Sequence, residues 1–354
     1  MNAQFTQHNL IFKQASGTSR GVLTTKETYL LEISENNKKG IGECAIFRGL
    51  SYDDVPDYEE KLTWLCKNIN LDFEVLKKEL LHYPSIIFGL EQALLNLEHG
   101  EDLYFPSDFT DGKDSIKING LIWMGNADFM QSQIEEKLAK GFDCIKLKIG
   151  VDWKSEKEII KKLREKFPKE QLELRVDANG AFSYEEARMV LQELADLGIH
   201  SIEQPIKKSE VRSPKSEENS EKKSTDCCIP WNKMARLCAE TPTPIALDEE
   251  LIGIIDFEEK KKLLETIKPQ YIILKPALVG GFSGSDEWIA IAESLGINWW
   301  ITSALESNIG LNAICQYTYT KKNPLPQGLG TGALFTNNFE THLQLEGDQM
   351  WHKK

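Results

Sequence analysis

The sequence lacks the features of a membrane protein and of a secreted, disulfide-stabilised protein. No run reaches the ~18 to 20 uncharged apolar residues that a membrane helix needs, and the N-terminal region has no apolar stretch of signal-peptide length. The 7 cysteines are scattered, with no C-x-x-C pair and no interleaved histidines, which argues against a disulfide framework and against a zinc site. We therefore expect a cytoplasmic protein without a membrane partner.

The sequence also lacks an excess of positive charge. The chain carries 42 Lys and Arg residues against 55 Asp and Glu residues, a formal net charge of -13. We expect no nucleic-acid partner, because phosphate binding needs a local basic excess. The composition leaves open whether the protein is a monomer or a homo-oligomer.

The N-terminal region, residues 1–115, is predicted to form an α+β domain. Between Leu10 and Cys44, short apolar runs alternate with glycine and polar turns, which favours an antiparallel sheet. The apolar spacing then becomes helical in residues 57–69, 72–81 and 85–98.

From Ile116 onward, the pattern is strand, loop and helix, repeated. We predict strands that end near Ile122, Ile149, Asp177, Glu203, Asp248, Lys275, Ser303 and Gly330. Their regular spacing, with one long interval, indicates an α/β fold, a modified (β/α)7β TIM-type barrel over residues 116–335. A polar insertion rich in Ser, Lys and Glu, at about residues 207–226, explains the long interval. Residues 336–354 are predicted to form a C-terminal segment that returns to the N-terminal domain.

Charged residues close the predicted strands, where the active site of a parallel barrel lies. They are Lys146 and Lys148 on the second strand, Asp177 on the third, Glu203 on the fourth, Asp248 on the fifth and Lys275 on the sixth. A lone K-x-K is usually a solvated strand edge and a lone D-x-N is usually turn chemistry. Their joint placement on consecutive strands is what favours a functional interpretation.

This set of side chains suits one kind of chemistry. Three carboxylates without His or Cys favour Mg²⁺, with Mn²⁺ as the alternative, and the lysines would face a small-molecule carboxylate substrate bound to the metal. Removal of a proton next to a carboxylate needs a cation to neutralise the resulting enediolate, together with a nearby base. Lys148 is the candidate base.

The motifs "KLK", "RVDAN", "IEQP", "ALDEE" and "LKPALVGG" together resemble the enolase superfamily, specifically its muconate lactonizing subgroup, over nearly the whole chain. A Lys or His base with Mg²⁺ is the established pattern of that superfamily. The resemblance implies that the N-terminal domain caps the barrel and that Asp177, Glu203 and Asp248 hold Mg²⁺. It also implies that Lys148 removes the proton, with Lys275 on the opposite face stabilising the anion, and that Lys146 tunes Lys148 and contacts the substrate carboxylate.

Further residues are candidates for supporting roles. Asn179 and Glu249 match polar positions that orient the metal ligands. Arg175 is expected to meet a carboxylate ligand or the substrate, with a structural ion pair as an equal alternative. Weaker candidates for substrate contact are Ser303, Phe47, Arg48 and Gly49. A core role is the alternative for Phe47, and a surface role is the alternative for Arg48.

The segments "TSRGVLTTKETYLLEI", "GIGECAIFRGLS" and "QGLGTGALF" favour one branch of the subgroup. This resemblance implies syn dehydration of 2-succinyl-6-hydroxy-2,4-cyclohexadiene-1-carboxylate. Racemisation of N-succinylamino acids and epimerisation of dipeptides are the alternatives on the same scaffold. The epimerases typically carry a D-x-D pair where this chain reads Gly328, Leu329, Gly330, which weakens that alternative. A remote alternative is a non-catalytic metal-binding interaction protein.

Overall fold

The structure is a computed structural model that describes residues 1–18, 21–123, 125, 127–208 and 231–353. Most of the predicted polar insertion, residues 207–226, lies outside the described residues. None of the helices in this described part of the chain combines the length and apolar character needed to cross a bilayer.

The N-terminal region forms an antiparallel sheet packed against three helices, which we call the cap. It contains β1 (Asn2–Thr18), β2 (Gly21–Glu35), β3 (Lys38–Cys44), α1 (Tyr58–Asn68), α2 (Phe73–Glu79) and α3 (Pro84–His99), with the strands in the order β1-β2-β3. β1 begins at Asn2 rather than near the predicted Leu10, because its polar first half pairs in register with β2, Asn2 opposite Ser34. The three predicted helices are confirmed within two residues at their ends.

The apolar helix α3 lies directly on β3, and glycines make this close packing possible. A methyl group added at Gly42 would lie 2.0 Å from the carbonyl oxygen of Gly89, and one added at Gly40 would lie 2.0 Å from that of Ala93. Because side chains larger than hydrogen cannot fit there, helix and strand approach to backbone contact.

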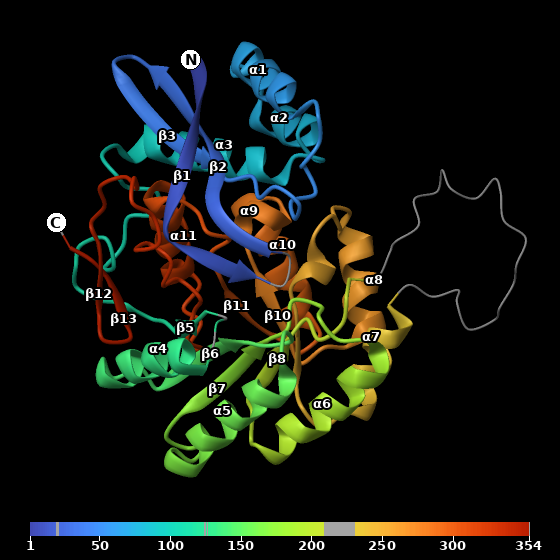
Figure 1. Ribbon diagram of the computed structural model, residues 1–354. Helices are drawn as coiled ribbons and strands as arrows, with labels where there is room; N and C mark the ends of the chain where they lie inside the picture. The colour runs from blue at the N-terminus through green and yellow to red at the C-terminus, as the bar shows by residue number, and fades with distance from the viewer. Residues whose placement is uncertain (19–20, 124, 126, 209–230, 354) are drawn as a thin grey trace, which may run out of the picture.

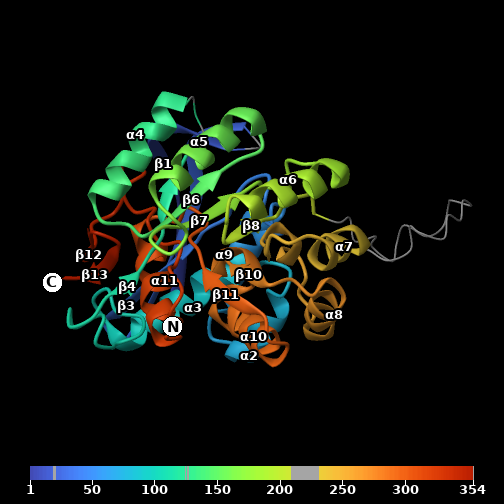
Figure 2. The same ribbon diagram turned by 90° about the horizontal axis from the view of Figure 1, so that it is seen from below.

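A seven-stranded parallel sheet, in the order β11-β10-β9-β8-β7-β6-β5, forms the second part of the molecule. Its strands are β5 (Gly120–Ile122), β6 (Cys144–Lys148), β7 (Glu173–Asp177), β8 (Ser201–Glu203), β9 (Ile245–Leu247), β10 (Tyr271–Leu274) and β11 (Asn298–Ile301). The helices are α4 (Ala127–Ala139), α5 (Trp153–Lys166), α6 (Tyr184–Asp196), α7 (Asn232–Glu240), α8 (Phe257–Ile267), α9 (Pro276–Val279), α10 (Gly281–Ser294) and α11 (Asn308–Thr320), with the 3-10 turn η2 (Glu249–Leu251) after β9. Figures 1 and 2 show the helices outside the strands and the cap at one end of them.

The barrel closes through the predicted eighth strand, which is reduced to isolated bridges. Gln327 pairs with Ile118, and Gly328 pairs with Thr302, both in parallel. Pro326 has no backbone N–H that could donate to a neighbouring strand. Its carbonyl accepts a hydrogen bond from the guanidinium of Arg175 (2.9 Å). The predicted α/β barrel with a separate N-terminal cap is therefore confirmed as the fold class, with the last strand shorter than expected.

The C-terminal segment contacts both parts of the chain. The backbone N–H of Thr336 donates to the carbonyl of Ile11 in β1 (2.8 Å). The hairpin of β12 (Leu343–Glu346) and β13 (Gln349–His352) then pairs with β4 (Ile116–Lys117), which follows the cap. The predicted domain boundaries at residues 115 and 335 stay predictions.

Two buried glutamates of the cap hold it on the barrel. Glu43 in β3 accepts hydrogen bonds from the backbone N–H groups of Ser307 (3.0 Å) and Gly310 (2.9 Å) at the start of α11. Glu91 in α3 accepts from the N–H of Phe282 (2.5 Å) and that of the next residue (3.2 Å) at the start of α10. Since these N–H groups have no partner within their helices, the cap satisfies them and complements both helix dipoles.

The contact between α3 and β3 leads to the first prediction. Gly42→Ala should lower the free energy of unfolding by about 1–3 kcal/mol, because the added methyl forces helix and strand apart. Urea unfolding measures this. Gly330→Ala is the control, since its added methyl would meet no atom closer than 3.4 Å. Equal stability of the two variants would contradict the packing described.

Glu91 leads to a prediction on pH. Burial raises the pKa of Glu91 from 4.5 to about 7. A carboxyl group whose pKa is raised by folding stabilises the fold fully below the unfolded pKa, and this contribution is lost as the pH rises to about 7. Glu91→Gln should therefore flatten the fall in unfolding free energy between about pH 4.5 and 7, by about 2–3 kcal/mol. A pH series of denaturant unfolding measures the difference, and parallel curves would contradict it.

Candidate active site

A cavity of about 380 Å³ lies between the cap and the carboxyl ends of the barrel strands. The cap contributes Val22 and Leu23 of β2 and residues 47–50 of the loop after β3, while the barrel contributes the ends of its strands. A cavity of this size, enclosed by two units of structure, fits a small organic ligand.

The parallel register brings the predicted charged residues together at this end of the barrel. Lys148 lies opposite Asp177, and Asp177 lies opposite Glu203, on neighbouring strands. Asp248 and Lys275 follow directly after β9 and β10. All of these side chains are largely buried, with exposed fractions of 12% or less.

The lysines lie between the carboxylates. Lys146 Nζ is 2.8 Å from Glu203 Oε2 and 3.5 Å from Asp177 Oδ2. Lys275 Nζ contacts Asp248 and lies 3.6 Å from Glu203 Oε1. Lys148 Nζ is 3.0 Å from Asp177 Oδ2. Three positive and three negative groups thus share one buried cluster, so none of them is left as an isolated charge.

The three carboxylates differ in how far neighbouring lysines offset the effect of burial on their pKa values. Burial opposes ionisation of Asp177, but Lys148 and Lys146 outweigh it and hold the pKa of Asp177 well below its ordinary value. Burial, followed by the charge of Asp177, raises the pKa of Glu203 to about 7. Burial also raises the pKa of Asp248. Glu203 and Asp248 would therefore gain from additional positive charge.

Asn179 and Glu249 lie in the cavity wall beside this cluster. Asn179 Oδ1 accepts a hydrogen bond from Lys148 Nζ (2.6 Å), and its Nδ2 donates to Glu249 Oε1 (3.2 Å). The backbone N–H of Asn179 donates to Asp177 Oδ1 (3.1 Å). Asn179 thus fixes the position of Lys148 relative to Asp177.

Gln204 is a supporting residue that the sequence analysis missed. Its side-chain oxygen accepts from the N–H of Asp248 (3.3 Å) and of Glu250 (3.2 Å), so it joins the ends of β8 and β9. Its position directly after Glu203, in the motif "IEQP", is the feature of the sequence that could have identified it as a supporting residue.

Arg175 is buried in the barrel interior, two residues before Asp177 on β7. Its Nε donates to Glu173 (2.6 Å), and its guanidinium lies over the ring of Trp300, 4.2 Å from the centroid. Of the two alternatives for this residue, these contacts are those of a structural ion pair.

The weaker candidates all line the cavity. Arg48 pairs with Glu27 and with Asp54 (2.8 Å), and Gly49 adopts a positive φ of 78° that favours glycine. The Ser303 hydroxyl donates to Glu306 (2.5 Å) and accepts from the hydroxyl of Thr331 (2.8 Å), so it supports the wall. Phe47 packs at the junction of two apolar clusters.

Two polar residues in the wall were not predicted. Asn119 Oδ1 and Thr302 Oγ1 are buried and have no hydrogen-bond partner among the described residues. Both belong to the seam where the barrel closes, next to Gln327 and Gly328. Both residues lie in predicted strands, those that end near Ile122 and Ser303, but the sequence pattern does not show that these particular side chains face the cavity.

The donor set fits a hard divalent cation. Three buried carboxylates on consecutive strands supply oxygen ligands of the kind that Mg²⁺ prefers. Glu203 Oε1, within the described part of the chain, accepts no hydrogen bond and so has its lone pairs available.

Comparisons with known proteins agree with this architecture. Residues 130–216 and 226–349 match the family model described as "Enolase C-terminal domain-like". The chain belongs to this family and therefore to the enolase superfamily, as the sequence motifs indicated.

Individual relatives cover nearly the full chain. An o-succinylbenzoate synthase from Desulfotalea psychrophila is 41% identical, covering 98% of each chain. The crystal structure of MenC from Desulfotalea psychrophila LSv54 has a TM-score of 0.83 at 39% identity, covering 99% of each chain. A dipeptide epimerase from Enterococcus faecalis V583, solved with Mg and the dipeptide L-Leu-L-Tyr, has a TM-score of 0.80 at 18% identity, covering 100% of this chain and 97% of the other, and shares the fold.

The cluster leads to a prediction on stability. Lys146→Met removes the cation between Asp177 and Glu203, and an unpaired buried charge costs about 3–5 kcal/mol. In the presence of a chelator, the variant should lose unfolding free energy of that order in urea titrations. Lys137→Met is the matched control, since Lys137 is half-buried on α4 beside Phe142 and outside the cluster. Equal losses in both variants would show that the cluster is not electrostatically coupled.

Proposed function

We propose that this protein is an o-succinylbenzoate synthase, a lyase that removes water from 2-succinyl-6-hydroxy-2,4-cyclohexadiene-1-carboxylate in menaquinone biosynthesis. The observation that carries the proposal is the cluster of three lysines and three carboxylates at the ends of β6 to β10, open to an enclosed cavity of ligand size. The full-length similarity to an o-succinylbenzoate synthase supports the choice of reaction.

Asp177, Glu203 and Asp248 are the residues that would hold Mg²⁺, with Mn²⁺ as the alternative. When bound there, the ion supplies the positive charge that stabilises a substrate carboxylate as the neighbouring proton leaves. A relative with the same fold was solved with Mg, which is consistent with this assignment.

Lys148 is the residue that moves the proton. Its Nζ reaches the cavity wall and is positioned by Asp177 (3.0 Å) and Asn179 (2.6 Å). In its neutral form it takes the proton next to the ring carboxylate, and the bonding electrons move toward that carboxylate. The resulting ammonium then gives the same proton to the departing hydroxyl group, so the products are water and the aromatic ring.

Lys275 and Lys146 act through charge. Burial opposes the charge on Lys275, but Asp248 and Glu203 outweigh it and raise the pKa of Lys275, so it stays a cation. Such a cation can stabilise the anionic ring from the side opposite Lys148. The pKa of Lys146 is also raised, because Glu203 and Asp177 outweigh its burial. It can bind the substrate carboxylate and tune Lys148.

The remaining cavity residues would select the substrate. Arg48 and Gly49, on the loop after β3, would contact the succinyl group, while Phe47 and Ser303 shape the wall beside it. Asn179 and Glu249 would orient Lys148 within the cluster, while Arg175 stabilises the barrel interior through its ion pair with Glu173. We further infer a cytoplasmic enzyme whose partner is a small anionic molecule, consistent with the free cysteines of the described segments, for example Cys44 and Cys315.

The same lysine pair could racemise N-succinylamino acids, so the assay must separate the two reactions. With Mg²⁺ and the cyclohexadiene substrate, loss of diene absorbance should follow protein concentration. Lys148→Ala should lower kcat by about 10²–10⁴-fold, because it removes the group that moves the proton. Lys140→Ala, on the exposed surface, is the control.

Two outcomes would count against this assignment. Absence of diene turnover together with racemisation of N-succinylamino acids would favour the racemase. Unchanged kcat in Lys148→Ala, with Mg²⁺ still bound, would exclude the proposed proton transfer and favour a binding protein.

A further inference from the structure

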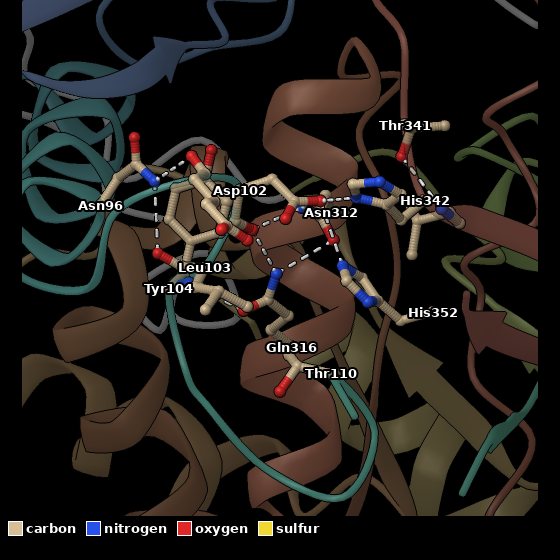
Figure 3. Close-up of polar contacts among 12 residues, drawn as sticks. Asn96, Asp102, Leu103, Tyr104, Thr110, Asn312, Gln316, Thr341, His342 and His352 are labelled. Carbon is tan, nitrogen blue, oxygen red and sulfur yellow. Dashed lines mark hydrogen bonds and ion pairs between the residues drawn. The ribbon is translucent and has the colours of Figure 1, made fainter. Parts of the chain in front are cut away.

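A cluster of one carboxylate and two imidazoles joins the segment after α3 to the C-terminal hairpin (Figure 3). Asp102 Oδ2 is 2.6 Å from His342 Nδ1 and 3.1 Å from His352 Nε2. These three atoms all lie within 4.8 Å of one another. None of the three residues lines the catalytic cavity.

The fold brings these residues together from distant parts of the sequence. Asp102 follows α3, and its backbone carbonyl accepts hydrogen bonds from Asn312 Nδ2 (2.9 Å) and Gln316 Nε2 (2.8 Å) of α11. His352 ends β13 and pairs in register with Leu343, directly after His342. Asp102 is therefore held rigidly by α11, while both imidazoles come from the C-terminal hairpin.

The geometry of the cluster suits a bound cation, because one ligand atom from each of the three residues faces the same small space. His352 is fully buried, with its Nε2 aimed at this carboxylate. Asp102 Oδ1 is also buried and, among the residues described, has no hydrogen-bond partner. The cluster thus presents two imidazole nitrogens and a carboxylate with an unused oxygen.

We propose that Asp102, His342 and His352 form a second metal site, which binds a zinc-class divalent cation and fastens the C-terminal hairpin to the segment after α3. Two imidazoles and a carboxylate are a known ligand set for Zn²⁺, whereas Mg²⁺ prefers oxygen ligands alone. Ligands of a tetrahedral zinc lie about 3.4 Å apart at the usual bond lengths of about 2.1 Å. His342, which is 43% exposed, can rotate to open the short contact to Asp102, and water can take the fourth position.

The site would act on stability rather than on catalysis. The hairpin β12–β13 is joined to the barrel by pairing with β4, which is only two residues long. A cation bound to both histidines and to Asp102 adds a link between the hairpin and the segment after α3, which the backbone pairing does not provide. Zinc binding to the folded state alone raises stability by mass action.

The test uses the full chain, loaded with excess Mg²⁺ so that the catalytic carboxylates are occupied by that ion. Zn²⁺ is then titrated by calorimetry, and thermal unfolding is measured with and without Zn²⁺. The variants are Asp102→Asn and His342→Gln, and His99→Gln on the exposed end of α3 is the matched control. Co²⁺ is a second probe, since a tetrahedral site containing nitrogen ligands gives it strong visible absorption.

We expect one equivalent of Zn²⁺ to bind to the wild type and to His99→Gln, with a rise in Tm. His342→Gln and Asp102→Asn should lower the affinity for that equivalent more than about tenfold and remove the rise in Tm. The Co²⁺ absorption should disappear in the same two variants. Equal zinc binding in all four proteins, or none in the wild type, would overturn the proposal and leave the cluster as a hydrogen-bonded contact only.

Discussion

The buried pairing of lysines with carboxylates at the end of the barrel is the interaction on which the rest of the structure depends. Lys146 lies between Asp177 and Glu203, and Lys275 lies between Glu203 and Asp248. Without these cations, three carboxylates on adjacent strands would repel one another in a medium of low dielectric. We propose that the same groups bind the metal and the anionic substrate, so that one cluster serves both the stability of the ligand-free protein and catalysis.

The cap completes this site, and its attachment follows from simple hydrogen-bond requirements. Glu43 accepts hydrogen bonds from the first N–H groups of α11, the helix that follows β11. Glu91 accepts them from the first N–H groups of α10, the helix that precedes β11. The loop after β3 is thereby held over the cavity, where Phe47 and Arg48 form part of its wall. The barrel helices and the loop after β3 are therefore coupled through two carboxylates as well as through apolar packing.

The sequence predicted much of this arrangement because parallel strands repeat with a regular period and end at charged residues. The strand ends near Lys148, Asp177 and Glu203 are where the pattern placed them. It could not show which side chains meet across the interior, such as Arg175 with the ring of Trp300, because these contacts depend on the three-dimensional arrangement of the strands. Glu43 and Glu91 were missed since their partners lie about 190 or more residues away. His342 and Asp102 were missed for the same reason.

A crystal structure with Mg²⁺ and o-succinylbenzoate bound would show whether the lysine–carboxylate cluster binds both ligands. We expect the ion on Asp177, Glu203 and Asp248, with the lysine contacts to these carboxylates lengthened. The product ring should lie between Lys148 and Lys275, covered by the loop that carries Phe47. An ion bound elsewhere, or a product with both lysines on one side of its ring, would exclude the proposed roles of these residues.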